Sequence, residues 1–137
     1  MALKIAIIGY GKMGRIIEKI ALERKHIIVA RLEKGWVQDD LNNADVALEF
    51  TEPNSAYSNI QEALRAGVCV VSGTTGWYDK ISDLKKESQN AGLVYSSNFS
   101  LGVNILFELN DKMAELFSHH DQYKACLLYT SDAADDG

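Results

Sequence analysis

The chain has 137 residues, 47% of them hydrophobic and 24% charged, with a net charge of −5. This composition is typical of a globular protein and excludes a disordered or fibrous chain. The acidic balance argues against nucleic acid or an anionic membrane surface as the main partner. No apolar run approaches the roughly 20 residues of a membrane span, and no signal-peptide pattern is present. Because Cys69 and Cys126 fit buried thiols in a reducing compartment, we expect a cytoplasmic protein.

Apolar periodicity predicts strands that alternate with helices along most of the chain. The predicted strands are 4–8, 27–32, 46–50, 68–71 and 93–96. Helices are predicted around 13–21, from Pro53 to just before Gly67, from the end of the loop 73–79 to about Ala91, and over 103–117. Residues 33–44 are predicted to be a connection with at most a short helical turn. Since helices that join successive strands cover both faces of a parallel sheet, the predicted fold class is α/β with a doubly wound parallel sheet.

The loop after the first strand has the sequence Gly9-Tyr10-Gly11-Lys12-Met13-Gly14, a G-x-G-x-x-G motif between a strand and a helix. In this setting Gly9 permits a tight turn, Gly11 lets the backbone approach a pyrophosphate, and Gly14 lets helix and strand pack closely. The N-terminus of the helix then favours an anion. The motif predicts a Rossmann-like dinucleotide-binding domain. The alternative is a glycine turn that only reverses the chain.

Two charged residues follow the second predicted strand. Glu33 lies where a carboxylate accepts hydrogen bonds from an adenosine ribose diol, which favours NAD. Lys34 beside it is suited to a ribose phosphate, so the sequence permits the use of both NAD and NADP. The alternative is that both residues are simply loop charges.

Three further loops after predicted strands are rich in glycine and hydroxyl side chains. They are Phe50-Thr51-Glu52-Pro53, Gly73-Thr74-Thr75-Gly76-Trp77 and Ser96-Ser97-Asn98-Phe99-Ser100. Because ligands bind beyond the carboxyl ends of parallel strands, we expect these loops to line one crevice. Each loop taken alone is also compatible with an ordinary turn that caps a helix.

Four segments together resemble the dihydrodipicolinate reductase family of bacterial lysine and diaminopimelate biosynthesis. They are Gly9–Arg15, Glu49–Thr51, Gly73–Trp77 and Ser97–Asn104, and the resemblance extends from Met1 to about Phe117. It implies a reductase that uses NADH or NADPH to transfer a hydride to hydroxy-tetrahydrodipicolinate or the dihydrodipicolinate derived from it.

The resemblance also implies roles for individual residues. Residues 9–13 would hold the pyrophosphate, Glu33 the ribose, 73–75 the nicotinamide side, and 96–99 the cofactor end of the active cleft. The candidate cofactor-binding residues are Gly9, Tyr10, Gly11, Lys12, Met13, Gly14, Glu33, Phe50, Thr51, Gly73, Thr74, Thr75, Ser96, Ser97, Asn98 and Phe99.

Members of the family continue into a substrate domain that begins with an E-x-H-H-x-x-K motif, which His119-His120 does not match. We therefore expect a dinucleotide-binding domain over 1–125, then a strand remnant and an atypical acidic tail over 126–137, with no substrate domain. The chain is expected to bind cofactor as a monomer or weak oligomer and to be nearly inactive alone. It has no candidate catalytic residue, and its His and Cys residues lack metal-ligand spacing. The alternatives are a non-catalytic dinucleotide sensor and the cofactor domain of a different NAD(P)-dependent reductase.

Overall fold

The computed structural model describes residues 1–84, 87, 91–124 and 126. The chain divides into two compact units, Met1–Phe99 and Ser100–Gly137. The expectation of a single dinucleotide-binding domain over 1–125 stays a prediction. The strand remnant and acidic tail predicted over 126–137 lie outside the described residues, apart from Cys126.

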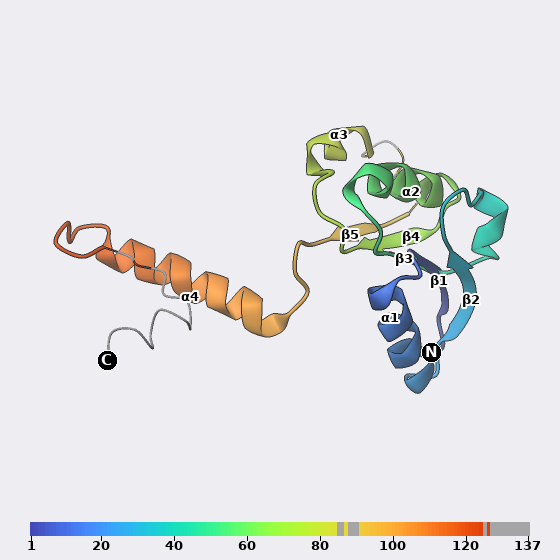
Figure 1. Cartoon of the computed structure of the whole chain (residues 1–137), viewed down its shortest axis with the longest axis horizontal. Coiled ribbons are helices and arrows are strands. Elements are labelled where there is room, and N and C mark those ends of the chain that lie inside the picture. Colours follow the sequence, from blue (N-terminus) through green and yellow to red (C-terminus); the bar gives the residue numbers. More distant parts are fainter. Residues whose placement is uncertain (85–86, 88–90, 125, 127–137) are drawn as a thin grey trace. The chain divides into compact units, whose positions relative to one another are not determined.

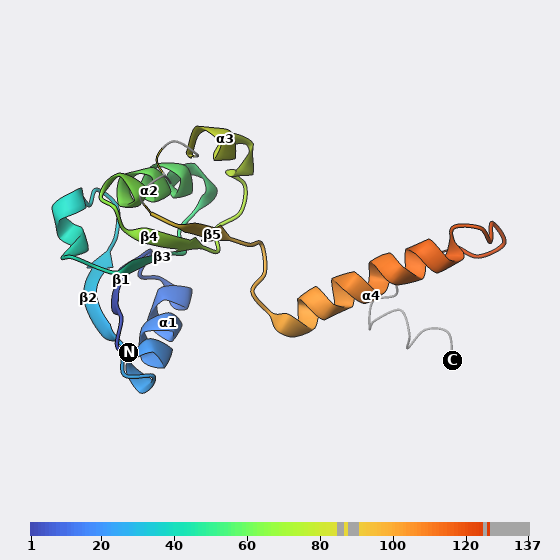
Figure 2. The ribbon, with the colours of Figure 1, turned by 180° about the vertical axis from the view of Figure 1, so that it is seen from behind.

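The first unit is built on a five-stranded parallel sheet (Figure 1). Its strands are β1 (Lys4–Ile8), β2 (Ile27–Leu32), β3 (Val46–Glu49), β4 (Cys69–Ser72) and β5 (Leu93–Tyr95), in the order β2-β1-β3-β4-β5. The helix α1 (Lys12–Glu23) lies on one face, and α2 (Pro53–Arg65) and the short α3 (Ile81–Leu84) lie on the other, as Figure 2 shows from behind. The described part of this unit also contains the 3₁₀ turns η1 (Gln38–Leu41) and η2 (Tyr78–Lys80). The predicted α/β doubly wound fold is confirmed.

Alternation along β1 divides the core between the two faces of the sheet. Ile5 and Ile7 pack with Ala21 of α1, whereas Ala6 and Ile8 belong to the larger cluster beneath α2. Successive side chains of a strand point to opposite faces, so a strand covered on both faces is apolar throughout. Element limits agree with the predicted ones to within two residues, except for the helix predicted to reach Ala91. Most of that helix beyond Leu84 lies outside the described residues.

The expectation of buried thiols is wrong, because Cys69 and Cys126 are both exposed. Cys69 is the first residue of β4 and lies at the amino-terminal edge of the sheet, where its Sγ accepts a hydrogen bond from Gly92 N at 3.4 Å. The core side chains of β4 come later in the strand. Apolar neighbours in sequence therefore did not indicate burial at this position.

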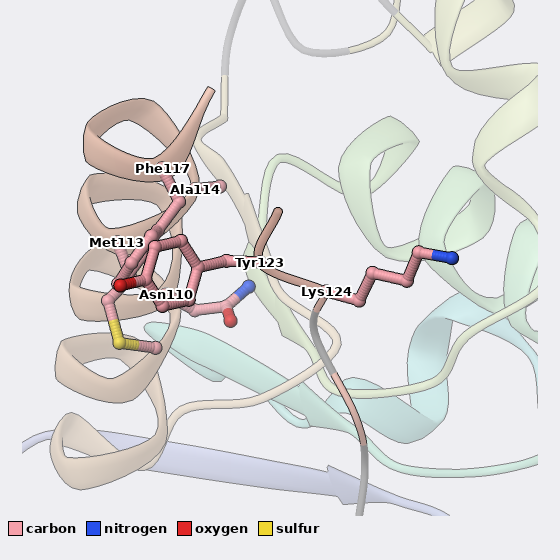
Figure 3. A pocket seen from close by; sticks show the side chains of 6 residues that line it. All are labelled: Asn110, Met113, Ala114, Phe117, Tyr123 and Lys124. Carbon is pink, nitrogen blue, oxygen red and sulfur yellow. The ribbon is translucent and has the colours of Figure 1, made fainter. Parts of the chain in front are cut away.

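The second unit contains α4 (Leu101–Phe117). Ser100 is the N-cap of this helix, and its hydroxyl accepts a hydrogen bond from Val103 N. After α4 the chain turns through His119 and His120. Tyr123 then lies against Phe117, with ring centroids 5.3 Å apart. This turn and α4 line a small open pocket of about 240 Å³, with Tyr123 beside the helix and Lys124 pointing away from it (Figure 3).

Candidate functional site

A groove of about 600 Å³ runs along the carboxyl ends of β1, β2 and β3. It is lined by Gly9, Tyr10, Gly11, Glu33, Lys34, Gly35, Phe50, Thr51, Glu52, Asn54, Ser55, Ser58 and Asn59. Six of the sequence-predicted residues therefore meet in one groove: Gly9, Tyr10, Gly11, Glu33, Phe50 and Thr51. This is the edge at which open α/β sheets bind their ligands.

The glycines of the first loop have three different environments. Gly9 has φ +96°, and a Cβ there would overlap the carbonyl oxygen of Phe50. A Cβ on the buried Gly14 would overlap the carbonyl oxygen of Gly9. A Cβ on Gly11 would meet nothing within 4 Å, so the backbone at this position borders open groove. Gly11 is also the N-cap of α1, and no side chain caps this helix. The turn, the close packing and the open approach that a pyrophosphate requires are therefore all present.

Tyr10, between the first two glycines, is held in place by charged side chains. Its hydroxyl donates to Glu18 of α1, and Arg31 Nε donates to the same carboxyl group at 2.9 Å. The guanidinium groups of Arg15 and Arg31 lie 5.6 and 5.9 Å from the Tyr10 ring centroid, within range of a cation–π interaction. The hydrogen bonds from Arg31 and Tyr10 lower the pKa of Glu18. These contacts fix the Tyr10 ring in the wall of the groove.

The rim of the groove at β2 is exposed and charged. Glu33 and Lys34 are both exposed, and Lys34 Nζ lies 3.4 Å from Glu52 Oε1 across the opening. The side chains of this pair are 89% and 58% exposed, so the ion pair contributes little to stability. Both charges at this end remain accessible to a ligand.

At the end of β3, by contrast, the carboxyl group of Glu49 is completely buried. Its Oε2 accepts a hydrogen bond from Ser72 Oγ at 2.6 Å, and its Oε1 accepts from Thr74 Oγ1 at 3.1 Å. The backbone N and the hydroxyl of Thr51 also donate to Oε1. One carboxyl group thus connects the ends of β3 and β4 with the loops that follow them.

This network continues into the wall of the groove through Thr51. The Thr51 hydroxyl accepts hydrogen bonds from Asn59 Nδ2 at 3.3 Å and Ser55 Oγ at 3.1 Å. Asn59 is oriented by Trp36, whose Nε1 donates to Asn59 Oδ1 at 3.0 Å. Through Thr51, Glu49 therefore helps to position the α2 side chains that line the groove.

Glu49 and the polar side chains of α2 were not predicted from the sequence as site residues. Two signals were available. Glu49 is a charged residue inside a strand that is otherwise apolar, which is rare unless its carboxyl group is paired or hydrogen-bonded. Asn54, Ser55, Ser58 and Asn59 recur at helical spacing in the first turns after β3, as a polar helix face does.

The other sequence-predicted residues do not line the groove. Lys12, Met13 and Gly14 belong to the first turn of α1, Gly73, Thr74 and Thr75 follow β4, and Ser96, Ser97, Asn98 and Phe99 follow β5. A Cβ on Gly73 would overlap the Phe50 ring, so this glycine packs behind a groove residue. Thr74 is buried, and its carbonyl oxygen accepts from Trp77 Nε1 at 2.7 Å. Asn98 N donates to Ser96 Oγ at 3.1 Å, which closes the loop after β5.

Two kinds of feature are absent from the described part of the chain. It contains no group of three or more His, Cys, Asp or Glu side chains that could hold a metal ion. It also contains no helix with the length and apolar character needed to cross a membrane.

Comparisons with known proteins agree on one family. Residues 3–99 match the family model described as "Dihydrodipicolinate reductase, N-terminus". A 4-hydroxy-tetrahydrodipicolinate reductase from Christiangramia forsetii is 41% identical over 125 residues, which cover 88% of this chain and 52% of that protein. Proteins of the same name from Chromobacterium violaceum and Staphylococcus haemolyticus are each 30% identical, over 86% and 87% of this chain and 54% of their own length. The chain thus spans about half the length of the curated relatives it matches.

Proposed function

Because the chain belongs to the dihydrodipicolinate reductase family, we propose that it is the nicotinamide-dinucleotide-binding part of a 4-hydroxy-tetrahydrodipicolinate reductase. The observation that carries this proposal is the groove in which Gly9, Gly11 and Glu33 meet at the carboxyl edge of the sheet. When bound, the reduced cofactor supplies the hydride for the reaction. The chain itself supplies binding and orientation.

The assignment follows the carboxyl edge of the sheet from β2 to β5. Glu33 would accept hydrogen bonds from the adenosine ribose, and the backbone of residues 9–13 at the uncapped N-terminus of α1 would bind the pyrophosphate. Tyr10, Phe50 and Thr51 would form the wall. Gly73–Thr75 and Ser96–Phe99 would border the nicotinamide half, beyond the groove. The open space at Gly11 supports this assignment, because a side chain there would occupy the place of the ligand.

We also propose that both NADH and NADPH are used. Glu33 suits the ribose diol of NADH, whereas the exposed ammonium group of Lys34 suits the additional phosphate of NADPH. Lys34 needs only to leave a solvent-exposed ion pair with Glu52, which costs little. The small-molecule substrate of the relatives would be bound only by the complete enzyme.

Calorimetric titration with NADH and NADPH tests the proposal. We expect the unaltered chain to bind both, and Gly11→Val to abolish binding while the fold is retained, because a Cβ at Gly11 meets no protein atom within 4 Å. The matched control is Gly92→Val at the amino-terminal edge of the sheet, where a Cβ would make an ordinary contact of 3.8 Å with Cys69 Sγ. Absence of binding to the folded, unaltered chain would refute the proposal.

A further inference from the structure

The Glu49 carboxyl group is buried and ionisable, and the proposed function gives it no direct contact with the cofactor. It is 0% exposed. Among the described residues no lysine, arginine or histidine forms an ion pair with it. Burying a carboxylate is costly unless hydrogen bonds or a cation compensate for the lost water. Its position therefore needs an explanation beyond packing.

Three donors converge on Glu49 Oε1, an arrangement suited to a negatively charged carboxylate. Because the Trp36 indole can only donate, it holds Asn59 with Oδ1 toward itself and Nδ2 toward Thr51. The Thr51 hydroxyl accepts from that amide, which leaves its own proton for Glu49 Oε1. Thr74 Oγ1 accepts from Thr51 N at 2.9 Å, so its proton also points to Glu49 Oε1. Hydrogen bonds to the charged form compensate for a buried carboxylate.

The sheet order puts this carboxylate beneath the second half of the proposed ligand. In the order β2-β1-β3-β4, Glu33, proposed to bind the ribose, follows β2, and the loop proposed to bind the pyrophosphate follows β1. A dinucleotide that continues in the same direction brings its nicotinamide half over the ends of β3 and β4. Glu49, Ser72 and Thr74 lie at those ends. This step rests on the proposed function.

We propose that the buried negative charge of Glu49 favours the oxidised cofactor over the reduced one. The two forms differ by one positive charge, which the nicotinamide ring carries only when oxidised. A fixed carboxylate in a low-dielectric surrounding attracts that charge more strongly than an exposed carboxylate does. The preference for a charged ring would then be built into the fold beneath the groove.

The first test compares ligands on the unaltered chain. Titration with NAD⁺ and with the dinucleotide in which neutral benzamide replaces nicotinamide changes only the ring charge. We expect NAD⁺ to bind about tenfold more tightly, as for one partly screened charge pair inside a protein. Equal affinities would overturn the inference and leave the proposed function intact. If no dinucleotide binds to the folded chain, the proposed function fails and the inference fails with it.

The second test removes the charge from the protein. Glu49→Gln is expected to reduce the ratio of NAD⁺ affinity to benzamide-dinucleotide affinity to about one, whereas Glu49→Asp, which keeps the charge, restores part of it. Glu23→Gln at the far end of α1 is the control for net charge and should leave the ratio unchanged. A purely structural role would lower both affinities equally, and that result would overturn the inference. If Glu49→Gln does not fold, the ligand comparison on the unaltered chain decides.

Discussion

The carboxyl ends of strands β2 and β3 use acidic side chains in opposite ways. At the β2 end Glu33 is exposed on the rim of the groove, beside Lys34. At the β3 end Glu49 is fully buried and accepts hydrogen bonds from Ser72, Thr74 and Thr51. The first carboxyl group is available to a ligand, and the second holds the protein loops.

The exposed carboxyl group is suited to contact a ligand, whereas the buried one supports the protein structure around it. The exposed end can change its charge or its partner at little cost, because water solvates every group there. The buried end cannot, because each of its donors depends on the same carboxyl group. Substitutions at the β2 end should therefore change ligand preference, and substitutions at the β3 end should change stability as well.

The largest effect is expected at Gly9, which follows β1, the strand between β2 and β3. Gly9→Val forces a side chain into φ +96° and into the Phe50 carbonyl oxygen. The strained backbone and the overlap together should cost about 2–5 kcal/mol of unfolding free energy. Urea denaturation followed by circular dichroism measures this loss.

The control for that substitution is Gly11→Val in the same loop. Gly11 has an ordinary φ of −83° and no neighbour within 4 Å of a Cβ. Its unfolding free energy should change by less than about 1 kcal/mol, as is usual for a surface substitution. A comparable loss for both variants would show that the tight contact with Phe50 is not what makes Gly9 necessary.

The next largest effect is expected at Glu49 and is measured against the same substitution at Glu33. Glu49→Gln replaces one acceptor oxygen by an amide donor that faces hydroxyl groups. This change should lower the free energy of unfolding by about 1–3 kcal/mol. Glu33→Gln on the rim should lower the free energy of unfolding by less than about 0.5 kcal/mol. Urea denaturation of both variants measures the difference. Equal losses would mean that burial does not distinguish the two ends.

The same contrast explains what the sequence could predict. Strand limits, the glycine loop and Glu33 follow from local periodicity and spacing, and the structure places Gly9, Gly11 and Glu33 in one groove. The Glu49 network joins residues 23 to 25 positions apart, from Glu49 to Ser72 and Thr74. Such contacts depend on the pairing of β3 with β4, which puts Glu49 opposite Ser72. A sequence pattern within one segment does not show which residues of β3 and β4 lie opposite each other.

A smaller effect is expected at Lys34, beside the exposed Glu33. Lys34→Ala should weaken NADPH binding by up to about fivefold, the range of an exposed ion pair, and leave NADH binding unchanged. The reason is that only NADPH carries the additional ribose phosphate. Calorimetry with both nucleotides measures the ratio. Lys19→Ala on α1, outside the groove, is the matched control and should change neither affinity. Equal weakening of both nucleotides by Lys34→Ala would contradict the assignment.

The smallest expected effect is at Glu18, which holds Tyr10 in the groove wall. Because the pKa of Glu18 is lowered in the folded chain, its hydrogen bonds with Arg31 and Tyr10 stabilise the fold at neutral pH. That contribution is lost as the pH falls through the lowered pKa. Glu18→Gln should therefore be less stable than the unaltered chain at neutral pH and equal to it in acid. Thermal unfolding across this pH range measures the difference, and a constant difference would mean that the carboxylate charge is not what holds Tyr10.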